Sequence, residues 1–259
     1  MRARAELFSV GILAKKKYYF FSDVHLGLKS REEEKLKEKK LVAFLNSIQP
    51  DCEKLFIVGD LFDCWIEYRK VVPKGYFRLL AKISELSESG IEVNFFSGNH
   101  DFWLNTYLRD EVGMKLYYDK YTTELDGKKF VITHGDGLSE GDWGYKILKK
   151  ILRSRFNQFL YSLIHPDIGI WLAQGSSKTS RHQKSDKSHG AVGMQEYAAT
   201  KIIEGFDYVV MGHFHKPQNI EIKRSDGTNG YYITLGDWIQ NFTYGEYSNG
   251  KFELKSWVS

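Results

Sequence analysis

The sequence predicts an α/β fold, and three features of its pattern support this. Over the first hundred residues, short apolar runs alternate with amphipathic helical segments, the order expected of a mostly parallel sheet. Each apolar run ends on polar side chains that can carry chemistry. After about residue 115 the pattern changes to shorter strands joined by glycine-containing turns and interrupted by one long helical segment. We therefore expect an α/β core with a helical insertion.

The first half of the chain reads strand, helix, strand, helix, strand. Residues 18–21 form an aromatic run typical of a buried strand. Residues 30–48 carry Leu, Phe and Ile at helical spacing and end before Pro50, so they predict an amphipathic helix with a solvated charged face. The remaining elements of this half are expected as strands at 55–58 and 91–96 and as a helix at 73–88, with Gly90 as its C-cap.

The second half is expected to contain hairpins and the insertion. Asp126-Gly127 is a strong turn signal between strands, and the segment 175–188 is rich in Ser and Lys and is typical of a loop. The other expected elements are strands at 121–125, 130–133 and 208–211, helical stretches at 143–173 and 191–204, and hairpins through Gly227 and Gly250.

The composition is that of an ordinary globular protein. The 259 residues include 37 Lys and Arg and 33 Asp and Glu, a formal net charge of +4, with 42% hydrophobic residues. This excludes the highly charged disordered class and permits one domain with an insertion, or two small domains. Two cysteines are too few for a disulfide framework, which favours a reducing compartment. No apolar run approaches the roughly 20 residues of a membrane helix, and Glu6 and Lys15 argue against a signal peptide.

Five predicted strand ends carry side chains that can bind a metal ion. Residues two apart on an extended segment share a face, so we expect the two members of each Asp-Xaa-His or His-Xaa-His pair to reach one metal region. A set of Asp, Asn and His suits manganese, iron or zinc rather than calcium. Seven ligands exceed what one such ion takes, so two ions sharing a carboxylate are predicted. The candidate ligands are Asp23, His25, Asp60, Asn99, His134, His213 and His215.

These residues stand in five ordered motifs: Asp23-Val-His25, Gly59-Asp-Leu-Phe-Asp63, Gly98-Asn-His-Asp101, His134 in His-Gly-Asp, and Gly212-His-Phe-His215. In this order, over residues 18–240, the chain resembles the calcineurin-like metallophosphoesterases. The resemblance implies a two-sheet β-sandwich flanked by helices, with the metals above the strand ends. It also implies that Asp23, His25, Asp60 and His215 hold one ion, and that Asp60, Asn99, His134 and His213 hold the other.

Such a pair of ions, for which we expect manganese with iron or zinc as alternatives, generates hydroxide near neutral pH and clamps phosphoryl oxygens. His100 and Asp101 are the predicted catalytic residues. His100 would donate a proton to the leaving oxygen or to the phosphoryl group, and Asp101 would orient its ring. Asp63 is either a hydrogen-bond partner of a metal ligand or an ordinary loop carboxylate.

Three further features indicate which members of this family the chain resembles most. Bulky aromatics stand beside the motifs in Asp-Cys-Trp65 and Asp101-Phe-Trp, about 78 positions separate His134 from Gly212, and Leu-Gly-Asp-Trp238 follows the last motif. Together these are similar to the UDP-2,3-diacylglucosamine pyrophosphohydrolases of lipid A biosynthesis, which carry a helical lid at this point. That resemblance implies attack of a metal-bound hydroxide on the α-phosphorus of an acylated UDP-sugar, giving UMP and 2,3-diacylglucosamine 1-phosphate.

The same resemblance divides the chain into a core, 1–140 and 190–259, and an inserted helical lid with a basic loop, 141–189. The apolar side of 147–172 would line a groove for acyl chains, or would be a packed cap. The basic residues would meet the diphosphate or the sugar phosphate, or form a solvated linker. The candidate substrate-binding residues are Asp142, Lys178, Arg181, Lys184 and Lys187.

Other functions remain as alternatives. A general phosphodiesterase or nucleotide pyrophosphatase on small soluble substrates is the main one, because His100 stands where many proteobacterial pyrophosphohydrolases have Arg. A nuclease, a non-catalytic scaffold and a protein phosphatase are less favoured, and no nucleic-acid partner is expected. We expect a cytoplasmic protein, monomeric by default, with peripheral contact to the cytoplasmic face of the inner membrane suggested only by its lipid substrate.

Overall fold

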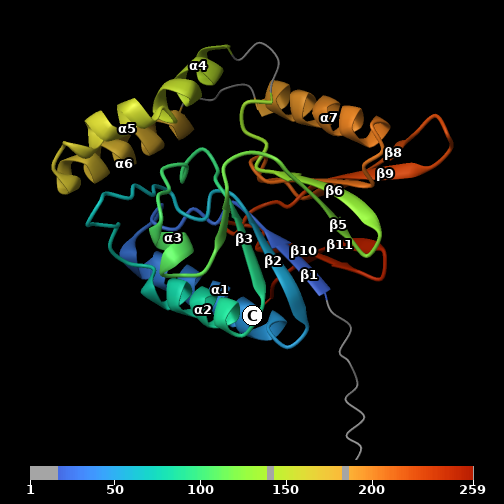
Figure 1. The fold of residues 1–259 in the computed structure, drawn as a ribbon, viewed down its shortest axis with the longest axis horizontal. Helices are drawn as coiled ribbons and strands as arrows, with labels where there is room; N and C mark the ends of the chain where they lie inside the picture. The colour runs from blue at the N-terminus through green and yellow to red at the C-terminus, as the bar shows by residue number, and fades with distance from the viewer. Residues whose placement is uncertain (1–16, 139–142, 183–186, 259) are drawn as a thin grey trace, which may run out of the picture.

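The computed structural model describes residues 17–138, 143–182 and 187–258 (Figure 1). Its first sheet has six strands in the order β11-β10-β1-β2-β3-β4. Strands β1 to β4 pair in parallel, and β10 and β11 are antiparallel. The strands are β1 (Lys17–Phe21), β2 (Cys52–Val58), β3 (Glu92–Phe96), β4 (Lys115–Tyr117), β10 (Thr243–Ser248) and β11 (Lys251–Ser256).

The second sheet has five strands in the order β5-β6-β7-β9-β8. Its central strands β6, β7 and β9 run parallel, and the two edge strands pair in antiparallel fashion. The strands are β5 (Tyr121–Leu125), β6 (Lys128–Thr133), β7 (Tyr208–Met211), β8 (Gln218–Lys223) and β9 (Asn229–Thr234). The hairpins predicted at Asp126-Gly127, Gly227 and Gly250 are confirmed.

Aromatic side chains fill the space between the two sheets. Phe20 of β1 stacks on Phe56 of β2 with ring centroids 4.6 Å apart, and on Phe130 of β6 at 6.2 Å. All three are fully buried. Offset stacking adds about 0.5–1.5 kcal/mol per pair beyond the burial of area, so these rings join the two sheets rigidly. The predicted two-sheet sandwich is confirmed.

Helices cover the outer face of each sheet (Figure 1). Helices α1 (Arg31–Ile48) and α2 (Phe77–Glu88) pack on the six-stranded sheet, and α7 (Lys187–Ile203) packs on the five-stranded sheet. Helix α1 begins at a capping box, in which the Ser30 side chain accepts from the Glu33 N–H and the Glu33 carboxylate accepts from the Ser30 N–H. This fixes where the helix starts, immediately after the first candidate ligands.

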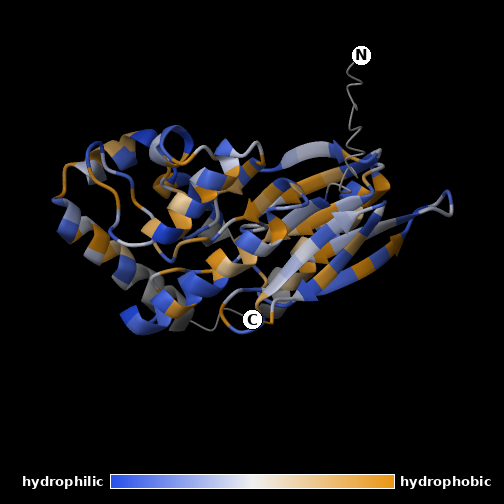
Figure 2. Cartoon of the chain, turned by 90° about the horizontal axis from the view of Figure 1, so that it is seen from below, coloured by the Kyte–Doolittle hydropathy of each residue, from blue (hydrophilic) through white to orange (hydrophobic). Residues whose placement is uncertain are grey.

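Three helices leave the sandwich between β6 and α7 and lie apart from both sheets (Figure 1). They are α4 (Trp143–Leu152), α5 (Arg155–Ser162) and α6 (Pro166–His182). They contact the core through a cluster that includes Tyr68 and Trp103 from the core and Tyr161 and Ile170 from the helices. Figure 2 shows hydrophobic and hydrophilic residues alternating along these helices. Among the described residues, no helix has the length and hydropathy needed to cross a bilayer.

Three expectations about secondary structure are corrected. The loop predicted at 175–188 is wrong, since α6 continues to His182 and α7 begins at Lys187, with 183–186 outside the described residues. Gly175 is the one residue of this stretch with a low helix propensity, and a glycine inside a helix costs only about 1 kcal/mol. Pro166 at the first position of α6 favours the start of the helix. Helix α2 begins four residues later than predicted, and the short α3 (Tyr107–Asp110) and β4 were not predicted.

Candidate metal centre

The candidate ligands gather where the parallel strands of both sheets end. Each follows the carboxyl end of β1, β2, β3, β6 or β7. The structure contains groups whose ligand atoms lie within 4.8 Å of one another. They are Asp23 with His25 and His215, Asp60 with His134 and His213, and His25 with Asp63 and His100.

Asp60 stands between the first two groups. Its Oδ2 lies 3.6 Å from His25 Nε2 and 3.3 Å from His134 Nε2. Its Oδ1 accepts a hydrogen bond from the His100 backbone N–H at 2.9 Å. The same His134 Nε2 atom also lies 3.3 Å from the Asn99 Oδ1 oxygen. One carboxylate oxygen therefore faces both groups, which is the position of a bridging ligand.

The second nitrogen of three histidines is held by the surrounding structure. His134 Nδ1 lies 2.9 Å from the Val58 carbonyl oxygen, which fixes Nδ1 as the donor and leaves Nε2 to face Asp60. In the other two histidines a carboxylate faces Nδ1. His25 Nδ1 lies 3.5 Å from Asp63 Oδ1, and His215 Nδ1 lies 3.7 Å from Asp237 Oδ2. Such partners set the tautomer and the ring orientation of metal-binding histidines.

Asp237 is a residue whose role the sequence did not predict. Its Oδ1 accepts from the backbone N–H groups of Ile239, Gln240 and Asn241, which lock it beside His215. The Leu-Gly-Asp-Trp motif singled out this position, but only as a mark of resemblance.

Five candidate ligands have left-handed backbone conformations. The φ angles are 54° for Asp23, 47° for His25, 53° for Asp60, 64° for His213 and 59° for His215, a region that residues other than glycine rarely adopt. The expected extended geometry is therefore wrong. His215 groups with Asp23 and His25, and His213 groups with Asp60 and His134, so this pair of histidines spans the two neighbouring groups.

The donor set fits divalent ions. The Asp23 Oδ1 oxygen is buried and accepts no hydrogen bond from any residue in the described ranges, and it faces His215 Nε2 at 3.3 Å. Burial alone would lower the pKa of His134, but the adjacent Asp60 carboxylate raises it to about 10, and the same attraction holds the pKa of Asp60 well below its usual range. Burial lowers the pKa of His25 to about 3. A proton and a metal ion thus compete for the same atoms.

His100 and Asp101 lie beside the candidate ligands, and contacts with other chain segments hold both side chains. The His100 Nδ1 atom lies 3.1 Å from the Asp63 carbonyl oxygen. The Asp101 carboxylate is fully buried and accepts from the backbone N–H groups of Asp60, Phe62 and Gly98 at 3.2, 3.2 and 2.8 Å. Asp101 therefore ties together the chain segments that follow β2 and β3, and its role in orienting His100 stays a prediction.

Two cavities open beside the candidate ligands. One, of about 380 Å³, is lined by His100 and Asn99 and by apolar side chains of both the core and the insertion, Trp65, Ile66, Phe102, Trp103, Leu148, Leu152, Tyr161 and Leu172. The other, of about 250 Å³, is polar and is lined by His134, Tyr118, Tyr197 and charged side chains. The two cavities share Asp136, Lys149 and Arg153.

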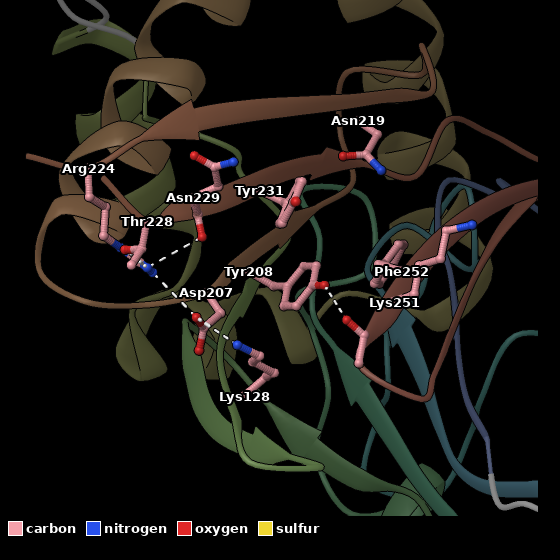
Figure 3. Close-up of a pocket in the computed structure, with 11 residues that line it drawn as sticks. Lys128, Asp207, Tyr208, Asn219, Arg224, Thr228, Asn229, Tyr231, Lys251 and Phe252 are labelled. Atoms are coloured by element: carbon pink, nitrogen blue, oxygen red, sulfur yellow. Dashed lines mark hydrogen bonds and ion pairs between the residues drawn. The ribbon is translucent and has the colours of Figure 1, made fainter. Parts of the chain in front are cut away.

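A third cavity, of about 510 Å³, lies at the opposite, amino ends of β6, β7 and β9 (Figure 3). Two of the cationic side chains that line it bind other groups of the protein. Arg224 donates to the carbonyl oxygens of Ile202 and Phe206, and Lys128 Nζ lies 3.7 Å from Asp207 Oδ1. This cavity contains none of the candidate ligands, and we assign it no part in the chemistry.

The predicted substrate-binding residues of the insertion are not placed. Asp142 and Lys184 lie outside the described residues, and so do the side chains of Lys178, Arg181 and Lys187. Their roles stay predictions.

Known proteins are similar to this chain over most of its length. Residues 16–217 match the family model described as calcineurin-like phosphoesterase. A Porphyromonas gingivalis protein named UDP-2,3-diacylglucosamine hydrolase is 32% identical, over 93% of this chain and 97% of that protein. A protein of the same name from Histophilus somni is 30% identical, over 92% and 99%. Among solved structures, the Escherichia coli phosphoesterase Yfce covers 93% of this chain and 92% of its own, at 15% identity and a TM-score of 0.44. The match to the family model and the identity to full-length relatives show that this chain belongs to the calcineurin-like phosphoesterase family.

Proposed function

We propose that this enzyme hydrolyses the diphosphate of UDP-2,3-diacylglucosamine. One water molecule is consumed, the bond between the α-phosphorus and the bridging oxygen breaks, and the products are UMP and 2,3-diacylglucosamine 1-phosphate. Relatives that match almost the whole chain carry this substrate in their names. The observation that carries the proposal is the apolar cavity beside His100 and Asn99, since a small soluble phosphodiester would have no use for its aromatic lining.

Members of this family use divalent metal ions, and the candidate ligands of this chain suit two. We propose manganese, held by Asp23, His25, Asp60 and His215 on one side and by Asp60, Asn99, His134 and His213 on the other. When bound, such ions lower the pKa of water and neutralise the charge that develops on phosphoryl oxygens.

His100 is the proposed proton donor. The carbonyl oxygen of Asp63 accepts a hydrogen bond from His100 Nδ1 and fixes the ring. When the ring is doubly protonated, its Nε2–H donates to the oxygen that leaves the α-phosphorus. Asp63 also faces His25, so a single loop residue positions both rings.

The insertion would act as a lid that binds the acyl chains. The insertion exposes large apolar side chains, including Phe156 and Leu163, which are 68% and 70% exposed. Leu148, Leu152, Tyr161 and Leu172 line the apolar cavity from this side. Each buried apolar side chain contributes about 1.5–3 kcal/mol, enough to make acylation a strong determinant of affinity.

We also propose that the enzyme is cytoplasmic and meets its lipid substrate at the membrane surface. Exposed Ile151 and Trp171 lie on the insertion together with exposed Lys146, Lys150 and Arg155. This combination suits an anionic lipid surface. Flotation with vesicles of phosphatidylglycerol tests it, and recovery of all the protein at the bottom of the gradient would contradict it.

The function is tested by release of UMP from UDP-2,3-diacylglucosamine in the presence of manganese, alongside the deacylated UDP-sugar and bis(p-nitrophenyl) phosphate. The Asp60→Ala variant is the control for metal dependence. Strong preference for the diacylated substrate supports the proposal. Equal turnover of the unacylated compounds, lost in Asp60→Ala, would favour the alternative of a general phosphodiesterase.

A further inference from the structure

Two cations of the insertion reach back to the candidate metal centre. Lys149 and Arg153 stand one turn apart on the same face of α4 and its C-terminal extension. Lys149 Nζ lies 2.7 Å from Asp136 Oδ2 and donates to the Asp136 carbonyl oxygen at 3.1 Å. Arg153 Nη2 lies 3.9 Å from the same Asp136 Oδ2. Asp136 is two residues after His134, so this contact is close to the candidate ligands.

Arg153 is held in place mainly by backbone groups. Its Nη1 donates to the Tyr118 carbonyl oxygen at 2.8 Å, and its Nη2 donates to the Gly98 carbonyl oxygen at 3.3 Å. Gly98 directly precedes the candidate ligand Asn99. The Arg153 Nε atom is buried and has no hydrogen-bond acceptor among the residues that the structure describes. Neutral carbonyls accept the two hydrogen bonds of the guanidinium, and the Asp136 carboxylate, 3.9 Å from it, makes its shorter contact of 2.7 Å with Lys149.

The pair occupies the boundary between the polar and the apolar cavity, both of which it lines. The charged side chains that line the polar cavity include the cations Lys120, Lys149 and Arg153 and the carboxylates of Asp119 and Asp136. The three residues that line both cavities are two cations, Lys149 and Arg153, and one carboxylate, Asp136, so the shared boundary carries more positive than negative side chains.

We propose that Lys149 and Arg153 bind the second phosphoryl group of the substrate, the one that is not attacked. This rests on the proposed function, in which the bridging oxygen stays with this group and adds negative charge to it when the bond breaks. Arg and Lys stabilise such a charge, and the planar guanidinium suits phosphate oxygens. A diester with one phosphorus has no group at this position, so the pair selects diphosphates.

The test compares two substrates in four variants. Lys149→Gln and Arg153→Gln remove the pair, and Lys39→Gln and Arg31→Gln remove exposed cations of helix α1 with the same change in net charge. For UDP-2,3-diacylglucosamine we expect kcat/KM to fall about tenfold to a hundredfold in the first two variants, the loss typical of a hydrogen bond to a charged group. For bis(p-nitrophenyl) phosphate, kcat/KM should stay within about threefold of the wild type. Both control variants should behave as wild type on both substrates.

Equal losses on both substrates would overturn the inference, because they would show that the pair only anchors α4 to the core. Unchanged hydrolysis of the diphosphate would overturn it as well. If Arg153→Gln does not fold, the same comparison is made with Arg153→Lys, which keeps the charge but loses the fork, together with Lys149→Gln. Wild-type enzyme that cleaves bis(p-nitrophenyl) phosphate but no UDP-sugar would refute the proposed function itself, and this inference with it.

Discussion

Substitution of Gly98 by alanine tests how tightly the carboxylate of Asp60 is positioned. A Cβ atom at residue 98 would lie 2.0 Å from Asp60 Oδ1 and 2.7 Å from the Asp60 backbone nitrogen. Ordinary van der Waals contact begins near 3.4 Å, so the carboxylate must move by about 1.4 Å. Metal–ligand distances tolerate only about 0.2 Å, and a misplacement of about 1 Å in a catalytic site costs on the order of a hundredfold in rate.

For Gly98→Ala we therefore expect kcat on bis(p-nitrophenyl) phosphate to fall at least about a hundredfold, together with weaker manganese binding in calorimetric titration. Gly144→Ala is the matched control, since a Cβ there meets nothing within 4 Å, and it should keep full activity. Circular dichroism spectra of both variants serve as the control for folding. A folded Gly98→Ala enzyme with wild-type manganese affinity and activity would refute the idea that Asp60 is fixed by the backbone packed against it.

Four further outcomes are expected. Asp60→Asn should lose activity and at least one manganese ion per chain by elemental analysis, because its Oδ2 faces both ligand groups; two retained ions would contradict this. His100→Gln should keep its metal content while kcat falls about 10²–10⁴-fold, and an unchanged kcat would exclude it as proton donor. Removal of metal by chelation should lower the unfolding temperature by roughly 5–10 °C relative to enzyme with metal at about a hundred times its Kd; coincident melting curves would contradict this. Phe102→Ala, in the apolar cavity, should reduce the preference for acylated over unacylated substrate about tenfold, and an unchanged ratio would place the acyl chains elsewhere.

The positions of the strands and the gathering of the candidate ligands could be predicted from the sequence. Strand β7 begins and ends where the apolar run 208–211 does, because a buried strand must be apolar on both faces. The Asp60 carboxylate meets the backbone N–H of His100 because both residues follow the carboxyl ends of the neighbouring parallel strands β2 and β3. The order of the motifs along the chain was therefore enough to predict that these residues lie together.

The contacts between distant segments could not be predicted. Asp101 is a carboxylate next to His100 in the sequence, which suggested that it orients the His100 ring. The sequence did not predict that Asp101 accepts hydrogen bonds from the backbone N–H groups of three separate residues. Lys149 and Arg153 look like the other basic residues of their helix, and only the path of the insertion brings them to Asp136. Such partners depend on tertiary packing, which leaves no periodic signal in the sequence.

The left-handed residues at the strand ends have a consequence for the response of this protein to selection. Each non-glycine residue in that region costs on the order of 1 kcal/mol or more, so the five positions together cost several kcal/mol, a large share of the usual net stability of a domain. Glycine at Asp23, His25, Asp60, His213 or His215 would relieve that cost. Directed evolution for heat tolerance alone would therefore favour substitutions at these positions. The most stable variants would still fold but would have lost the metal ligands and the hydrolytic activity.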